Sequence, residues 1–193
     1  MKPQILFAVI LFALNTWAGP KEDAAAFHDK LEYGKALQII RPLAANGVAW
    51  AQGRLGFLYY LSFGVKQDYK EALKWFKLAA IQGDAAGQRG LGALYKGGDA
   101  VVQDYVESIK WYKLAAAQGD ETAQTNLGDM YLSGMGEAQD FVRAHMWFNI
   151  AAINGYPYPT KQRDEVAKKM DSSQVTKAQR LARECQERKF KGC

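Results

Sequence analysis

Histidines, carboxylates and cysteines are the side chains in this sequence that could carry out chemistry, and their spacing supports little of it. His28 and His145 lie far apart along the chain. A zinc site needs three or four convergent ligands, so we predict no metal site. The acidic pair Asp29 and Glu32 falls on an expected surface or helix cap, with no sign of a shielded pocket that would shift a carboxyl pKa. We interpret both histidines as partly exposed residues at the two ends of the fold.

No catalytic motif with a known mechanism occurs in the sequence. There is no G-x-S-x-G nucleophile elbow, S-x-x-K serine motif, H-E-x-x-H zinc motif or phosphate-binding loop. Gly90-Leu91-Gly92 resembles part of a dinucleotide-binding fingerprint, but it falls inside a predicted helix, where the glycines are interpreted as packing residues. The sequence therefore predicts a protein that is not an enzyme and that holds no cofactor.

Cys185 and Cys193, the two cysteines of the chain, are predicted to form a disulfide. Cys185 is expected near the end of the last helix, and Lys191-Gly192 can turn the chain back toward it. An even number of cysteines in an exported protein favours pairing. The bond would hold the end of that helix in place and would have no redox role. Two free thiols, or a bond to another chain, are the alternatives.

Four aligned segments, spaced 36 residues apart, define the elements that must position these side chains. They are Glu32–Gly47, Asp68–Gly83, Asp104–Gly119 and Asp140–Gly155. A second motif recurs between them at the same step, as Leu55-Gly56-x2-Tyr59, Leu91-Gly92-x2-Tyr95 and Leu127-Gly128-x2-Tyr131. A fixed period of this size indicates an array in which each unit buries its apolar face on its neighbours. Such arrays present long surfaces to partners and seldom contain a reaction centre.

The residues that recur predict helix ends and a core. Asp68 and Asp104 are predicted N-caps, each completing a capping box with a glutamate three residues later, and the closing glycines are predicted left-handed C-terminal residues. Gly56, Gly92 and Gly128 are expected where paired helices approach closely. The recurring aromatic residues are interpreted as core: Trp75, Trp111 and Trp147; Phe76, Tyr112 and Phe148; Tyr59, Tyr95 and Tyr131.

Together these motifs resemble Sel-one-like repeats, relatives of the tetratricopeptide repeat, over residues 32–155. The tetratricopeptide pattern has a period of 34 and a tryptophan where this chain has Gln52, Gln88 and Gln124, and both departures favour the Sel-one-like family. The resemblance implies an all-α, right-handed solenoid of about four helix-turn-helix units. The outermost units depart from the pattern, with a short helix expected around Lys21–Lys30 and with Glu137 and His145 in the final unit.

Three regions are predicted along the chain. The first has one charge, Lys2, an apolar run from Ile5 to Leu14 and a cleavage site after Ala18, which is typical of a signal peptide. An uncleaved anchor is the alternative, and no membrane insertion is expected after cleavage. We predict a signal peptide at 1–18, the repeat array at 19–159 with repeat steps near 32, 68, 104 and 140, and a C-terminal helical cap with a basic tail at 160–193, its helices at 160–170 and 172–188.

The net charge of +5 is concentrated in the cap. Residues 160–193 hold ten Lys plus Arg against five acidic residues, whereas residues 20–158 hold fourteen against fifteen. A basic segment can attract nucleic acid, anionic lipid or an acidic protein. Because these charges follow a helical pattern, we interpret them as a solvated helix face and expect no nucleic-acid partner.

A stripe of residues that do not repeat is the predicted partner-binding surface. Positions 50, 53, 57 and 60 share one helix face, opposite the recurring one. Since their equivalents differ between units, packing between units is not expected to dictate them. In tetratricopeptide-like arrays this face lines the concave groove. We predict partner contacts from Trp50, Phe57, Tyr60, Arg89, Lys96 and Asp129. An ordinary surface with some apolar exposure is the alternative.

These observations predict a nonenzymatic adaptor or regulator that binds a protein or peptide in the bacterial periplasm or envelope. The partner and the oligomeric state are not indicated. One alternative is a binder or hydrolase acting on cell-wall material or β-lactams, as the family resemblance implies for cysteine-rich members; those carry a cysteine pair in each repeat, and this chain does not. A secreted factor that meets a host protein is the other.

Overall fold

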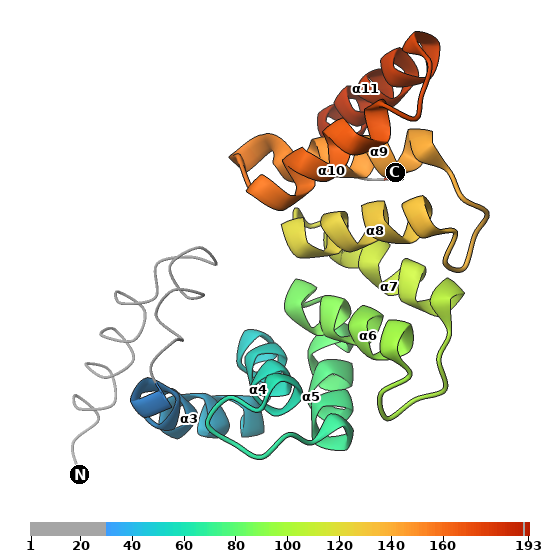
Figure 1. The fold of residues 1–193 in the computed structure, drawn as a ribbon. Coiled ribbons are helices and arrows are strands. Elements are labelled where there is room, and N and C mark those ends of the chain that lie inside the picture. Colours follow the sequence, from blue (N-terminus) through green and yellow to red (C-terminus); the bar gives the residue numbers. More distant parts are fainter. Residues whose placement is uncertain (1–29, 191) are drawn as a thin grey trace.

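The computed structural model describes residues 30–190 and 192–193, except for the side chains of residues 30–32 and 35, and this part of the chain is a stack of α-helices (Figure 1). The predicted signal peptide at 1–18, His28, Asp29 and nearly all of the helix expected at 21–30 lie outside the described residues. The helices are α3 (Lys30–Ala45), α4 (Ala49–Leu61), α5 (Tyr69–Ile81), α6 (Ala85–Gly97), α7 (Tyr105–Ala116), α8 (Glu121–Ser133), α9 (Phe141–Ala151), the short 3-10 helix η1 (Ala152–Asn154), α10 (Pro157–Ala167) and α11 (Ser172–Glu187).

Successive helices pack on one another along the stack. The pairs α4–α5, α6–α7 and α8–α9 form the units, and the first helices of neighbouring units also meet, α4 with α6 and α6 with α8. The described core crosses the boundaries between units: one apolar cluster joins α3 to α4, a second joins α5 to α6, and a third extends from α7 through α8 and α9 to the cap. Each unit is therefore stabilised by its neighbours, as in repeat proteins generally. The predicted all-α class is confirmed.

The predicted N-caps are present, but the predicted capping boxes are not. The Asp68 side chain accepts hydrogen bonds from the backbone N–H groups of Lys70 and Glu71. A capping box would also need the glutamate side chain to bind the Asp68 N–H, and that N–H donates instead to the carbonyl oxygen of Tyr59 at 3.1 Å. The Glu71 carboxylate accepts from the indole N–H of Trp75. The same backbone bond recurs in the later units, so the second helix is tied to the helix before it.

The recurring glycines of α4, α6 and α8 allow an aromatic ring to lie against the backbone. A Cβ atom on Gly92 would lie 2.7 Å from Cδ1 of Tyr112, and Gly56 and Gly128 face Phe76 and Phe148 in the same way. The close approach predicted for these glycines is confirmed, and it is an approach of ring to backbone. All three rings are buried.

The tryptophans one residue earlier only partly match the prediction of a core. Trp147 is buried, whereas Trp75 and Trp111 are half-buried. The final unit therefore covers its tryptophan more completely than the units before it.

Gln52, Gln88 and Gln124, which stand where the tetratricopeptide pattern has a tryptophan, are buried. Gln52 donates from Nε2 to the carbonyl oxygen of Ala44 at 3.1 Å, which satisfies the end of α3. Its Oε1 accepts from Gln82 Nε2 at 2.8 Å, and Gln118 and Gln88 repeat this contact one unit later at the same distance. An amide can both donate and accept in this position, which an indole cannot.

The glutamate that replaces the loop valine of the final unit is neutralised locally. Glu137 forms ion pairs with Arg143 and, at 3.8 Å, with Lys113. The Arg143 guanidinium also lies 4.5 Å from the ring centroid of Tyr131. In the two earlier units the position of Arg143 holds a glutamate and that of Glu137 a valine. The two departures from the repeat pattern, Glu137 and Arg143, therefore compensate each other, because the new acidic residue pairs with the new basic one.

The cap differs in its boundaries from the prediction. Helix α10 begins at Pro157, three residues before the predicted start. The two prolines that break the repeat period lie in its first turn, where no intrahelical N–H bond is lost. Helix α11 begins at a capping box formed by Asp171 and Gln174.

The structure joins Cys185 to Cys193 by a disulfide. Cys185 is buried in the apolar cluster shared by α9 and the cap. Lys189, Phe190 and Gly192 turn the chain back with left-handed backbone conformations, so the turn begins two residues earlier than the predicted Lys191-Gly192.

Candidate partner-binding surface

The first helices of the units form one continuous layer, because α4 packs on α6 and α6 on α8. We call its accessible side the α4–α6–α8 face, defined by Trp50, Arg54 and Phe57 on α4, Arg89 and Lys96 on α6, and Asn126 and Asp129 on α8. All of these residues except Trp50 are half-buried. Partial burial limits the conformations open to a side chain, so most of these residues have less freedom to lose when a partner binds.

The α4 part of the predicted stripe is not uniformly exposed. Trp50 is 36% exposed, whereas Gly53 is buried, and a Cβ on Gly53 would lie 2.4 Å from Oδ1 of Asp84 in the next unit. Phe57 packs edge-on against Phe76 with ring centroids 4.7 Å apart. The inference that packing between units does not dictate these positions is therefore wrong for Gly53, and Phe57 is held by a contact within its own unit. Different residues at one position can still be fixed by packing when each meets a different neighbour.

Tyr60 packs into an aromatic cluster at the other end of α4 from Trp50. Its ring centroid lies 5.4 Å from that of Tyr69 at the start of α5, and 6.3 Å from that of Phe76. Burial is the main cause that raises the Tyr60 pKa above its ordinary value, with a smaller contribution from Asp99. Of the aromatic residues predicted to contact a partner, Trp50 is thus the most accessible.

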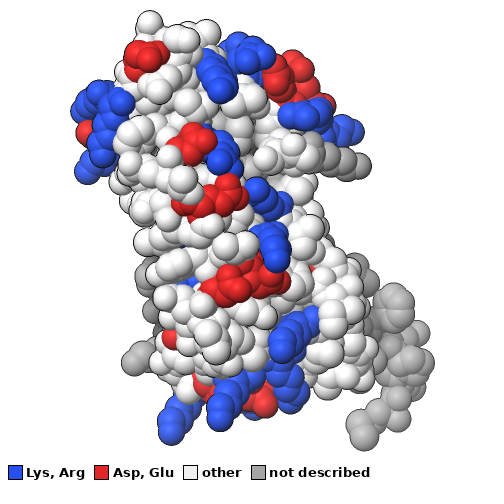
Figure 2. Space-filling view, turned by 90° about the vertical axis from the view of Figure 1, so that its right-hand side faces the viewer, with Lys and Arg blue, Asp and Glu red and all other residues white. Residues whose placement is uncertain are grey.

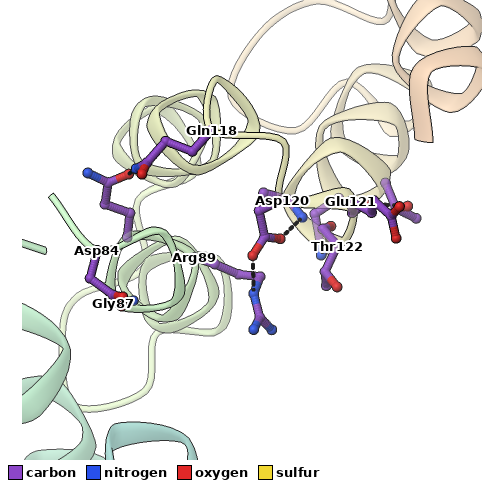
Figure 3. A network of polar contacts seen from close by, with 11 residues as sticks. Asp84, Gly87, Arg89, Gln118, Asp120, Glu121 and Thr122 are labelled. Carbon is purple, nitrogen blue, oxygen red and sulfur yellow. Dashed lines mark hydrogen bonds and ion pairs between the residues drawn. The ribbon is translucent and has the colours of Figure 1, made fainter. Parts of the chain in front are cut away.

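Arg89 contacts residues of both neighbouring units; Figure 3 shows its bond to Asp120. Its Nε donates to Oδ2 of Asp120 at 3.0 Å, and its guanidinium carbon lies 4.2 Å from the ring centroid of Phe57. Asp120 is also the N-cap of α8, where Oδ1 accepts from the N–H of Ala123 at 2.8 Å. Because both charged side chains are mostly shielded, this ion pair should contribute more than an exposed one.

The remaining predicted residues continue this line toward the cap. Lys96 donates from Nζ to Oδ1 of Asn126 at 3.0 Å, and Asp129 accepts from the Tyr158 hydroxyl at 2.9 Å. Burial raises the pKa of Asp129, while the Tyr158 hydrogen bond and the charge of Lys96 act in the opposite direction. Phe57, Arg89, Lys96 and Asp129 therefore follow a line from α4 toward α10, and each of the four also contacts another element.

Sequence reasoning did not select Arg54, Asp120, Asn126 and Tyr158. Asp120 could have been found, because Asp84 stands at the same place one unit earlier and both precede a helix. The partners of Lys96 and Asp129 are about thirty residues away, and no local pattern relates them.

Charges of both signs are mixed on the viewed side of the molecule, so no large area there carries one sign (Figure 2). The described residues contain no group of three or more His, Cys, Asp or Glu that could hold a metal ion. None of the described helices combines the length and apolar character needed to cross a membrane.

His145 is buried, so its interpretation as a partly exposed residue is wrong. It occupies the position of Leu73 and Ile109 in the preceding units, and its Nδ1 has no hydrogen-bond partner among the described residues. Burial, followed by the nearby Arg163, lowers the His145 pKa below its ordinary value, and Asp164 partly opposes this. The side chain is a buried polar group in an apolar position, with no sign of a ligand role.

Comparison with known proteins identifies the repeat. The profile of the family described as Sel1 repeat matches residues 51–84, 85–120 and 122–156, which together make up more than half of the chain. The chain belongs to the Sel1 repeat family. The matched Sel1 units coincide with α4–α5, α6–α7 and α8–α9, and proteins of this family are generally adaptors of protein interactions.

Solved structures agree with this assignment. One is the crystal structure of c5321, described as a protective antigen present in uropathogenic Escherichia coli strains and displaying an SLR fold. It has 31% sequence identity and a TM-score of 0.72, over 80% of this chain and 34% of that one. This chain thus spans about a third of the length of c5321.

A Sel1 repeat protein from Oxalobacter formigenes shares 35% identity with a TM-score of 0.57, over 67% of this chain and 97% of that one. No curated protein sequence matches the chain. The predicted solenoid of Sel-one-like repeats is confirmed.

Proposed function

We propose that this Sel1 repeat protein is a nonenzymatic adaptor or regulator that binds a segment of a partner protein along the α4–α6–α8 face. The observation that carries the proposal is the line of side chains from Phe57 to Asp129, each of which contacts a neighbouring unit or the cap, with the exposed Trp50 on the same helix as Phe57. Ordering long side chains on binding costs about 0.5–1.5 kcal/mol each. A surface whose side chains are already held avoids much of this cost.

The chemistry of the face favours an extended segment with an apolar anchor followed by hydrogen-bond acceptors. Trp50 and Phe57 offer aromatic surface for the anchor. Arg89 uses Nε for Asp120, and a guanidinium has four further N–H donors. Lys96 is similarly engaged through one donor. Since Asp129 lies on the same face, we expect carbonyl oxygens and single carboxylates as acceptors, and not a run of acidic residues.

We further propose that the protein is exported to the bacterial periplasm or beyond. The predicted signal peptide, the Cys185–Cys193 pair and the similarity to an antigen of uropathogenic E. coli support this location. Sequencing the N-terminus of protein isolated from the periplasm checks it, because a chain that begins at Gly19 requires both export and cleavage after Ala18. A chain that still begins at Met1 and remains in the cytoplasm would contradict it.

Crosslinking at residue 50 tests the binding face. A photoreactive phenylalanine analogue replaces Trp50 in the producing bacterium, and the crosslinked partner is identified by mass spectrometry. Affinity for that purified partner is then compared between Trp50→Ala and Phe63→Ala. Phe63 is a matched control, since it is equally exposed at 36% but lies beyond the end of α4, stacked on Tyr33.

We expect Trp50→Ala to weaken binding at least about tenfold, as for an aromatic anchor of an interface, and Phe63→Ala to have little effect. Equal affinities of the two variants would rule out the α4–α6–α8 face. Arg89→Ala is a less selective test because it also removes the contact between three units.

A further inference from the structure

The outward sides of α5 and α7 carry apolar side chains among lysines. We call this the α5–α7 outer face, defined by residues 70, 74, 77, 78 and 81 and by their equivalents 106, 110, 113, 114 and 117. The occupants are Lys70, Lys74, Lys77, Leu78 and Ile81, then Val106, Lys110, Lys113, Leu114 and Ala117. None of them is acidic. Leu78 is 40% and Leu114 49% exposed, so two adjacent units repeat the same exposed leucine.

The same positions are covered by helices in the final unit. Met146 and Ile150 of α9 correspond to Lys74 and Leu78, and they are only 5% and 2% exposed. Helices α10 and α11 both pack on α9, and the two residues share an apolar cluster with Val166 and Cys185 of the cap. Within this chain, the outward side of a unit's second helix is thus a surface on which helices dock.

The differences between the two faces indicate which helix would suit α5 and α7. The position of Ile150 holds a leucine in both earlier units, whereas the position of Met146 holds a lysine in both. Lys74 and Lys110 each pair with a glutamate one turn earlier, at 3.3 and 2.8 Å. Lys113 pairs with Glu137 at 3.8 Å, so Lys70 and Lys77 are the lysines of this face that form no ion pair with a described residue. An arriving helix must therefore bring an apolar stripe for Leu78 and Leu114 and acidic side chains beside it.

We propose that the α5–α7 outer face is a docking site for an acidic amphipathic helix of a partner protein. The helices that cover α9 are unsuitable occupants in a second copy of this chain, because residues 160–193 carry a net charge of +5 and would be repelled by the lysines. An anionic bilayer is less suitable than a helix, because it needs a broad positive surface, which Glu71, Glu107 and Glu137 reduce, whereas single acidic side chains of a helix can pair with Lys70 and Lys77. This surface is separate from the α4–α6–α8 face.

Synthetic peptides of about 18 residues test the proposal, since this length forms several helical turns. One peptide carries leucines at i, i+4, i+7 and i+11 flanked by glutamates, and its partner carries lysines in place of the glutamates. Fluorescence anisotropy measures binding of each peptide to the purified protein. We expect the acidic peptide to bind and the basic one to bind at least about tenfold more weakly.

Variants then locate the site. Leu78→Glu with Leu114→Glu should weaken binding of the acidic peptide at least about tenfold, by adding like charges and removing the apolar contact. Val102→Glu is the matched control, because Val102 is an exposed apolar residue outside this face. Trp50→Ala should bind the peptide normally, which separates this proposal from the proposed function. Circular dichroism and thermal melts check that each variant is folded.

Three outcomes would overturn the proposal. The first is that neither peptide binds, or that both bind equally well. The second is that the double variant binds the acidic peptide as tightly as the parent protein does. The third is that the acidic peptide fails to bind while vesicles of phosphatidylglycerol sediment the parent protein but not the double variant, in which case the face is a membrane surface.

Discussion

Gly92→Ala should destabilise the central unit even though alanine is the better helix former. The added Cβ would lie 2.7, 2.8 and 2.9 Å from three ring atoms of Tyr112, where an ordinary contact begins at 3.4 Å. The ring would have to move by roughly half an ångström or more. Tyr112 is buried between the helices of its unit, so the ring has little room to move.

The size of the effect follows from two opposing contributions. Overpacking a filled core costs about 1–3 kcal/mol, whereas replacing glycine by alanine inside a helix gains about 1 kcal/mol. We therefore expect a net loss of up to about 2 kcal/mol. Gly34→Ala in α3 is the matched control, because its Cβ would meet nothing within 4 Å. That variant should gain up to about 1 kcal/mol, so the two substitutions should have opposite signs.

Urea unfolding measures both variants, and a double-mutant cycle identifies the cause. In a Tyr112→Leu background the ring is absent, so Gly92→Ala should cost at least about 1 kcal/mol less than in the parent protein. Gly92→Leu, which adds more volume, should be less stable than Gly92→Ala. If Gly92→Ala proved as stable as Gly34→Ala, or its cost were unchanged without the ring, close packing would not explain the recurring glycine.

Three further predictions concern the final unit and the cap. His145→Leu should remove a buried polar group. Because the folded-state pKa of His145 is lowered, the parent protein should lose stability as the pH falls below about 6.5, while the variant should not. Urea unfolding at pH 8 and pH 5 measures this, and an equal loss of unfolding free energy in the parent protein and the variant would contradict it. Protein isolated from the periplasm without reductant should show no alkylation of Cys185 or Cys193, and Cys193→Ser should cost about 2–3 kcal/mol; labelling of both thiols would mean that the bond or the export assignment is wrong. Glu137→Val alone should destabilise the protein by about 0.5–1 kcal/mol, because Arg143 keeps only Asp140 as an acidic partner and Lys113 loses its own. Adding Arg143→Glu, which restores the residues of the earlier units, should recover most of that loss; additive effects in thermal melts would argue against a compensating pair.

Periodic features of the fold could be predicted from the sequence because they arise from local geometry. The 36-residue step, the aspartate before each second helix and the glycine after it depend on the backbone within one unit. The recurrence of Gly92 and Tyr112 at fixed positions likewise predicts one contact inside each unit. The capping box failed because the Asp68 N–H bonds to Tyr59 of the preceding helix, and that carbonyl is not a neighbour in the sequence.

Contacts between units were decided only by the tertiary structure. Whether Arg89 is free to bind a partner or is joined to Asp120, 31 residues away, depends on the angle and distance at which one unit packs on the next. The burial of Gly53 and the covering of Ile150 by the cap likewise depend on how one element packs on the next. A helical pattern defines which side chains share a face, but it carries no information on what lies opposite that face. For this reason the sequence determines that the protein is a solenoid of Sel1 repeats, while the packing of the units determines which of its side chains remain available to a partner.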